Sequence, residues 1–96
     1  MNSLPTIPLF PAGRVVATPG ALALLEQVNK SPVEFLSRHF RGDWGDLCSE
    51  DKTENELSLK HGFRILSSYP ITETEKLWII TEADRSVTTL LLPTEY

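Results

Sequence analysis

The sequence predicts a single α+β domain, with about three N-terminal helices packed on a small antiparallel sheet of three or four strands that ends in a C-terminal hairpin. Signals for helix starts recur in the first half of the chain, whereas residues 63–92 hold apolar, β-branched runs separated by turns. Helices followed by strands are typical of the α+β class. Ninety-six residues suffice for one hydrophobic core, so we expect one domain over residues 1–96.

The chain opens with a proline-rich arm. Pro5, Pro8 and Pro11 lie within residues 1–13, and each proline fixes its own φ and restricts the residue before it. We therefore expect an extended arm, followed by a short strand over residues 14–17.

The first helix is expected to begin at Thr18 and Pro19, since threonine is a good N-cap and proline suits the first helical position. The following apolar residues recur at near-helical spacing and predict its buried stripe. They are Leu22, Leu25 and Val28, with Leu24 beside them.

Ser31, Pro32 and Glu34 predict the start of a second helix, because a serine followed three residues later by glutamate forms a capping box. Gly42 is expected to end this helix. The predicted inward face holds Val33, Leu36 and Phe40, with Phe35 beside them.

A third helix is expected from about Ser49, because Glu50 and Asp51 suit the positive end of a helix. Gly62 predicts a left-handed stop. The segment contains few apolar residues, so we expect it on the surface.

Residues 63–70 predict a strand, 72–75 a turn, and the two runs around 82–86 a hairpin. The run over 76–82 starts apolar on both faces, which predicts the centre of the sheet. Alternation should place Trp78 and Ile80 on one face, and Leu77 and Ile79 on the other.

Composition excludes several classes of protein. The net charge of −4 disfavours direct nucleic-acid binding. One cysteine forms no internal disulfide and suits a reducing compartment. The N-terminus is a poor signal peptide, and no run approaches the roughly 18 apolar residues that span a bilayer. We therefore expect a cytoplasmic protein that does not enter membranes.

Charge is distributed unevenly along the chain. Residues 43–56 carry six acids against Lys52, a net charge of −5: Asp43, Asp46, Glu50, Asp51, Glu54 and Glu56. This acidic stretch is either a solvated helix surface or a surface for a basic partner. A small basic patch precedes it, formed by Lys30, Arg38 and Arg41.

Two further features have two interpretations each. Trp44 is either a lid on the core or an exposed anchor for a partner. The hairpin tip with Glu82, Asp84 and Arg85 is either ordinary turn chemistry with local Asp–Arg pairing or a contact surface. The candidate partner-binding residues are therefore Asp43, Trp44, Asp46, Glu50, Asp51, Glu54, Glu82, Asp84 and Arg85.

The sequence gives little support for catalysis or metal binding. His39, Asp43 and Cys48 lie close together, but acidic neighbours raise the pKa of a thiol and make it a poor nucleophile. A lone cysteine is more often a small buried hydrophobe. These residues do not show the spacing of metal ligands, even when His61 is added to them. We expect no enzyme, no cofactor and no metal.

Several segments together resemble a family of short proteins from bacterial plasmids and integrative elements. They are Gly42–Asp46, Glu54–Asn55, His61–Gly62, Arg64–Tyr69 and Trp78–Pro93, and the resemblance covers about Thr18 to Tyr96. Some members are labelled plasmid-related or type I restriction subunit M. The resemblance implies a setting on mobile DNA and transfers no catalytic residue. The chain has no Gly-rich strand-to-helix turn that would match a methylase cofactor site.

These observations favour a non-enzymatic interaction protein that inhibits a host defence complex, of the anti-restriction or anti-CRISPR type, through its acidic surface. One alternative is an accessory protein for plasmid maintenance or DNA processing that binds a protein or nucleic acid through the basic patch. Another is a small enzyme that uses the neighbourhood of His39 and Cys48.

Overall fold

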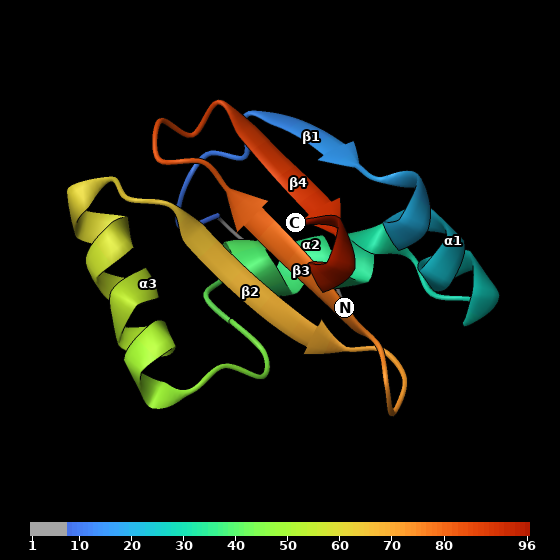
Figure 1. The fold of residues 1–96 in the computed structure, drawn as a ribbon. Helices are drawn as coiled ribbons and strands as arrows, with labels where there is room; N and C mark the ends of the chain where they lie inside the picture. Colours follow the sequence, from blue (N-terminus) through green and yellow to red (C-terminus); the bar gives the residue numbers. More distant parts are fainter. Residues whose placement is uncertain (1–7) are drawn as a thin grey trace, which may run out of the picture.

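A computed structural model describes residues 8–96, and it contains a four-stranded sheet with three helices (Figure 1). The strands are β1 (Arg14–Ala17), β2 (Ile65–Pro70), β3 (Lys76–Thr81) and β4 (Val87–Leu91). The helices are α1 (Pro19–Gln27), α2 (Pro32–Phe40) and α3 (Ser49–His61), followed at the C-terminus by the short 3-10 helix η1 (Pro93–Glu95). The predicted α+β class is confirmed. Of the predicted arm, residues 8–13 are described and residues 1–7 lie outside the described part.

The strand order is β1-β4-β3-β2, and the sheet is mixed. The β3–β4 hairpin and the β2–β3 pair are antiparallel, as expected. The prediction of a purely antiparallel sheet was wrong, because β1 pairs with β4 in parallel. A parallel pair needs a long crossover. Here the crossover consists of all three helices and the other two strands.

The strand β3 lies inside the sheet, between β2 and β4, as its apolar sequence predicts. Its side chains alternate as expected. Leu77 and Ile79 join the main core cluster, while Trp78 on the opposite face packs against Tyr96 with ring centroids 5.8 Å apart. In Figure 1, α2 covers one face of the sheet and η1 lies on the other.

The helix α1 begins as predicted, since the Ala21 N–H donates to Thr18 Oγ1 at 3.1 Å. Its buried face was predicted only in part. Leu24 and Leu25 are buried together with Ala21, but Leu22 is exposed. The buried residues therefore follow the helical spacing that begins at Ala21, one residue before Leu22.

The helix α2 also begins where expected, and its inward face was predicted in part. Phe35 and His39 are its buried residues, whereas Val33 is 65% exposed and Leu36 and Phe40 are partly buried. The predicted inward face is therefore correct in part, because Leu36 packs against the main core cluster and Phe40 against a second, smaller one. Only Val33 was wrongly placed, since the helix turns His39 and Phe35 most deeply toward the sheet, where His39 pairs with hydroxyl groups.

The N-cap of α2 is Ser31, whose Oγ accepts from the Val33 N–H at 3.2 Å. The expected capping box is incomplete, because the Glu34 side chain instead lies 3.9 Å from Lys30 Nζ. Ser31 therefore stabilises the helix start without help from Glu34.

Replacing Ser31 by alanine is expected to lower the free energy of unfolding by about 0.5–2 kcal/mol, because an N-terminal N–H loses its acceptor. Ser37→Ala on the same helix is the control, since an exposed serine in a helix interior has no capping role. Urea unfolding of both variants measures the difference. A Ser31 variant as stable as the Ser37 variant would contradict the capping role.

The helix α3 starts and stops as predicted, and Gly62 adopts the left-handed conformation with φ of 76°. It packs on β2 next to a second, smaller core cluster of Phe10, Trp44 and Ile65. Most of its residues are exposed, as its thin apolar content predicts.

The outer edge of β2 is covered by side chains and a loop. Asn55 on α3 donates to the Leu66 carbonyl at 2.6 Å and accepts from the Leu66 N–H at 3.1 Å. Ser68 bonds through its N–H to the Trp44 carbonyl and through its carbonyl to the Asp46 N–H. These bonds replace a neighbouring strand, so this edge offers little to another chain.

Candidate partner-binding surfaces

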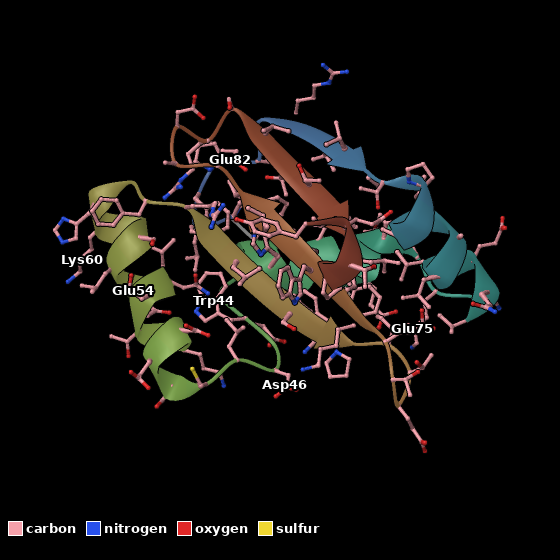
Figure 2. The ribbon with its side chains drawn as sticks, in the orientation of Figure 1. Trp44, Asp46, Glu54, Lys60, Glu75 and Glu82 are labelled. Atoms are coloured by element: carbon pink, nitrogen blue, oxygen red, sulfur yellow. The ribbon has the colours of Figure 1, made fainter. Side chains whose placement is uncertain are left out.

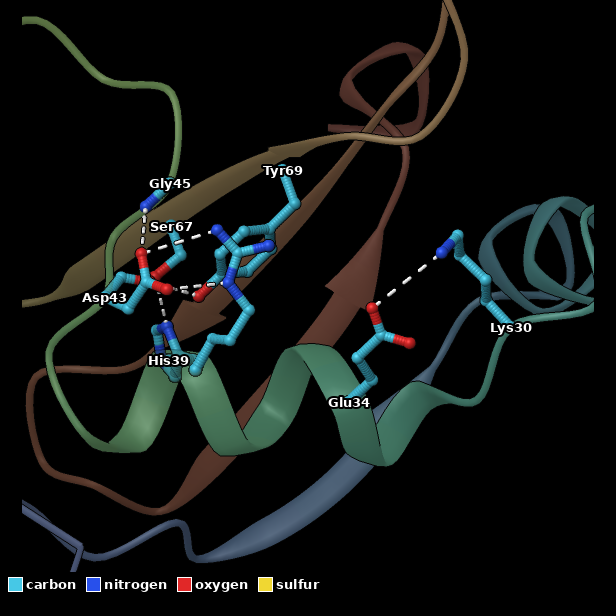
Figure 3. A network of polar contacts seen from close by, with 8 residues as sticks. Lys30, Glu34, His39, Asp43, Gly45, Ser67 and Tyr69 are labelled. Carbon is cyan, nitrogen blue, oxygen red and sulfur yellow. Dashed lines mark hydrogen bonds and ion pairs between the residues drawn. The ribbon is translucent and has the colours of Figure 1, made fainter.

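The acidic stretch 43–56 does not form one free face. The Asp43 carboxylate accepts from Arg38 Nε at 2.7 Å (Figure 3), and Asp46 lies 3.4 Å from Lys76 Nζ. Glu56 accepts from the indole N–H of Trp44 at 2.9 Å. The Arg38 guanidinium lowers the pKa of Asp43, which therefore stays ionised. Three of the six acids are thus engaged within the protein.

The other three acids share one flank of α3. Glu50, Asp51 and Glu54 are all exposed, and they line a shallow depression with Ser49 and Thr53. Residues three and four apart are neighbours on a helix surface, so these carboxylates lie side by side. In the part of the chain that the structure describes, no ion pair engages them.

The helix that carries these acids is held firmly from its opposite side. Asn55 and Ser58 are buried, and Ser58 Oγ donates to the Arg64 carbonyl at 3.1 Å. Arg85 Nη2 donates to the Ser58 carbonyl at 2.9 Å, near the end of α3. Glu50, Asp51 and Glu54 therefore lie on a helix that is firmly held in place.

Trp44 does not belong to a free surface. Its side chain is 4% exposed and lies between Phe10 and the α3 helix. The interpretation as a lid on the core is correct, and the interpretation as an exposed anchor is wrong. Figure 2 shows Trp44 between the sheet and α3, with Asp46 in the loop nearby.

The hairpin tip has a packing role that its sequence did not indicate. Arg85 has φ of 60° and donates to the carbonyl oxygens of Phe63 and Glu82 as well as to that of Ser58. Asp84 instead accepts from the Ser86 N–H at 2.9 Å, so the expected Asp–Arg pair does not form. Arg85 joins the hairpin to the C-terminal end of α3, where a cation is favourable.

The candidate residues therefore fall into separate places. Glu54 lies on α3, Glu82 at the hairpin tip and Asp46 in the loop before α3 (Figure 2). The flank of Glu50, Asp51 and Glu54 is the part that combines charge, exposure and rigid support. We call it the acidic flank.

The basic patch is largely neutralised. Arg38 is bound to Asp43 and stacks over the Tyr69 ring at 4.5 Å from its centroid, and Lys30 lies near Glu34 (Figure 3). Arg41 is exposed. Arg41 alone does not form a nucleic-acid binding surface, because such a surface needs several clustered positive charges.

His39 and Cys48 lie in different environments. His39 is fully buried and bonds to Ser67 Oγ at 2.6 Å and Thr81 Oγ1 at 2.9 Å. Cys48 is exposed at the N-cap of α3, so the expectation of a buried cysteine was wrong. Asp43 is taken by Arg38. The structure does not bring these three residues together as a nucleophilic site.

The buried polar chain around His39 has a defined direction. Thr88 Oγ1 donates to the Ala12 carbonyl at 2.8 Å, so Thr81 must donate in the 2.8 Å bond between the two threonines. Thr81 then accepts from His39 Nε2, and His39 Nδ1 accepts from Ser67. Because burial lowers the pKa of His39 to about 3, the ring is neutral near pH 7, with its proton on Nε2 and Nδ1 as an acceptor.

From the sequence we did not predict the hydrogen-bonded residues around His39. Their signal was present, because Ser67, Thr81 and Thr88 are polar residues at inward positions of β2, β3 and β4. Buried hydroxyl groups need partners. Such positions in three strands point to a shared buried partner, which is His39.

Among residues 8–96, no group of three or more His, Cys, Asp or Glu side chains is arranged to hold a metal ion. None of the helices in this range has the length and apolarity to cross a bilayer. Searches of family models, curated proteins and solved structures each return no match to the chain.

Proposed function

We propose that this chain is a non-enzymatic binding protein of the bacterial cytoplasm, encoded on a mobile element, that inhibits a host defence complex. The observation that carries the proposal is the acidic flank of α3. The setting on mobile DNA comes from the resemblance described above. The partner surface is the basic nucleic-acid channel of a restriction or CRISPR complex.

The charge and the support of the acidic flank fit this role. Three neighbouring carboxylates with no ion-pair partner among residues 8–96 attract a basic surface and raise its rate of encounter. Because Asn55 and Ser58 fix the helix from behind, little order is lost when the flank binds. Occupation of a basic channel by this flank would exclude DNA or guide RNA from it.

Replacing Glu50, Asp51 and Glu54 by their amides is expected to slow association with a purified type I restriction or CRISPR complex by about tenfold at low salt. The salt dependence of the rate should flatten at the same time. Stability should change by less than about 0.5 kcal/mol, because the side chains are exposed. Stopped-flow association and DNA-cleavage inhibition measure these effects.

The matched control replaces three exposed acids elsewhere, Glu26, Glu73 and Glu75, by their amides. This variant carries the same change in net charge and should retain the rate of the unmodified protein. Equal slowing in both variants would mean that overall charge acts and not the acidic flank. Absence of binding and inhibition with every complex tested would refute the function itself.

A further inference from the structure

The strand β1 leaves one edge of the sheet open. It is the outermost strand beside β4, and no described helix or strand lies beyond it (Figure 1). The opposite edge, at β2, is already occupied by Asn55 and by the loop with Trp44 and Asp46. An open edge presents a row of unpaired N–H and C=O groups and can accept another strand. β1 is therefore the place where this sheet can be extended.

The pairing with β4 determines which backbone groups of β1 point outward. The N–H groups of Arg14 and Thr18 both donate to carbonyl oxygens at the β4 side, at 2.9 Å. Because backbone groups alternate along a strand, Val16 also faces β4. The N–H and C=O groups of Val15 and Ala17 point away from β4, and no hydrogen bond within residues 8–96 engages them.

The side chains of β1 alternate between the two faces of the sheet. Ala17 packs against the main core cluster, which identifies its side of β1 as the face covered by the helices. Arg14, Val16 and Thr18 therefore lie on the opposite face, where η1 is found (Figure 1). There Thr18 Oγ1 donates to Glu95 Oε1 of η1 at 2.6 Å. An acid is thus fixed at one end of β1, and an exposed arginine lies at the other end.

We propose that β1 pairs with β1 of a second copy of this chain, antiparallel about a two-fold axis at Val16, so that two sheets join into one. Val15 of each copy stands opposite Ala17 of the other, and these outward residues exchange both of their N–H···O bonds. The two Val16 side chains meet at the axis as a close pair without hydrogen bonds between them. The interface is self-complementary, as a two-fold dimer requires.

The charges at the ends of β1 match this arrangement. Arg14 of one copy stands opposite Thr18 of the other, with Cα atoms about 4.5 Å apart, on the face that carries Glu95. The hydrogen bond from Thr18 lowers the pKa of Glu95, so this carboxylate is ionised near pH 7. Within residues 8–96 neither Arg14 nor Glu95 has an ion-pair partner. The two-fold axis forms the contact twice, which favours a second copy over an unrelated strand.

This interface is separate from the acidic flank. The helix α3 packs on β2, at the opposite edge of the sheet from β1. Pairing through β1 therefore leaves the acidic flank of each copy accessible. The inference goes beyond the proposed function, and its test needs only the purified chain.

The first test is sedimentation velocity of the full chain over a concentration series. We expect a reversible dimer with twice the 10.8 kDa mass of the chain. Val15→Pro should abolish it, because proline removes an outward N–H that the monomer does not use, and edge strands tolerate proline. Val15→Thr keeps this N–H at the same position and should leave the dimer intact.

The second test concerns the charges. Arg14→Glu places like charges together twice and should weaken dimerisation by about tenfold or more. Arg41→Glu, the same change at an exposed arginine on another surface, should leave the dissociation constant unchanged. Circular dichroism and urea unfolding establish that each variant is folded.

The third test is a disulfide across the two-fold axis, in a Cys48→Ser background that removes the exposed natural thiol. Val16→Cys should form an intermolecular disulfide under mild oxidation, because the distance of a close pair suits a disulfide. Val15→Cys is the control. Val15 is 46% exposed, but it stands opposite Ala17 and not opposite its own copy, so it should cross-link much more slowly.

Several results would overturn the proposal. A chain that stays monomeric at every concentration would exclude the dimer. A dimer that persists in the folded Val15→Pro variant would use another surface. An Arg14→Glu dimer as strong as the unmodified one, or equal cross-linking of Val15→Cys and Val16→Cys, would exclude the antiparallel arrangement about Val16.

Discussion

Replacing Ile79 by alanine is expected to lower the free energy of unfolding by about 2–5 kcal/mol, because the smaller side chain leaves a cavity in the main core. Ile79 is 0% exposed. It lies on the central strand β3, opposite Ser67 of β2 and Leu90 of β4, and faces the helices. The cavity would open between the sheet and the helices α1 and α2, so relaxation of the neighbours should fill little of it.

Val15→Ala is the control for this substitution. Val15 lies on β1 at the edge of the sheet and is exposed, so its truncation should cost less than about 0.5 kcal/mol. Reversible urea unfolding gives both free energies. A loss below about 0.5 kcal/mol for Ile79→Ala would show that the hairpin is not the centre of the core.

The second large effect is a loss of stability in mild acid that is caused by His39. The unfolded chain binds a proton at a histidine near pH 6.5, whereas the folded protein keeps His39 neutral down to a pKa of about 3. Protons therefore bind preferentially to the unfolded state below pH 6.5. The free energy of unfolding should keep its full value above pH 6.5. Below pH 6.5 it should fall by about 1.4 kcal/mol per pH unit.

Between pH 6.5 and pH 5 the expected loss is about 2 kcal/mol. Asp43, whose pKa is lowered by Arg38, also contributes stability that the protein loses as the pH falls. That loss occurs only at the lower pH where carboxylates titrate. The range above pH 5 therefore isolates the histidines. Urea unfolding at intervals from pH 7.5 to pH 5 measures the slope.

The chain has two histidines, which gives a direct control. His61→Gln alters an exposed residue and should keep the full slope. His39→Gln should be less stable at every pH and show little slope over this range. A slope that disappears in His61→Gln, or unchanged stability of the natural protein from pH 7 to pH 5, would contradict the role given to His39.

The sequence predicted those features that depend on neighbouring residues. The N-caps Thr18 and Ser31 and the left-handed stop at Gly62 act within one turn of the chain, so their residue types suffice to locate them. The β3–β4 hairpin also follows from local alternation of apolar residues.

The same reasoning predicted the inward face of α2 only in part. Helical spacing marked Val33, Leu36 and Phe40, of which Leu36 and Phe40 pack against the core clusters and Val33 is exposed. It did not place His39 in the core, because the hydroxyl groups that bind His39 come from the sheet. The sheet residues that hold His39, Ser67 and Thr81, are 28 or more positions away along the chain.

The candidate site shows the same division. The sequence by itself determined that an acidic segment exists and that most of it forms a helix. Only the tertiary structure decided which acids remain free, because Asp43, Asp46 and Glu56 found their partners in Arg38, Lys76 and Trp44. It likewise made Arg85 a link between the hairpin and α3. Charge can be counted along a chain, but whether a charge is available to a partner depends on contacts that form only when distant segments meet.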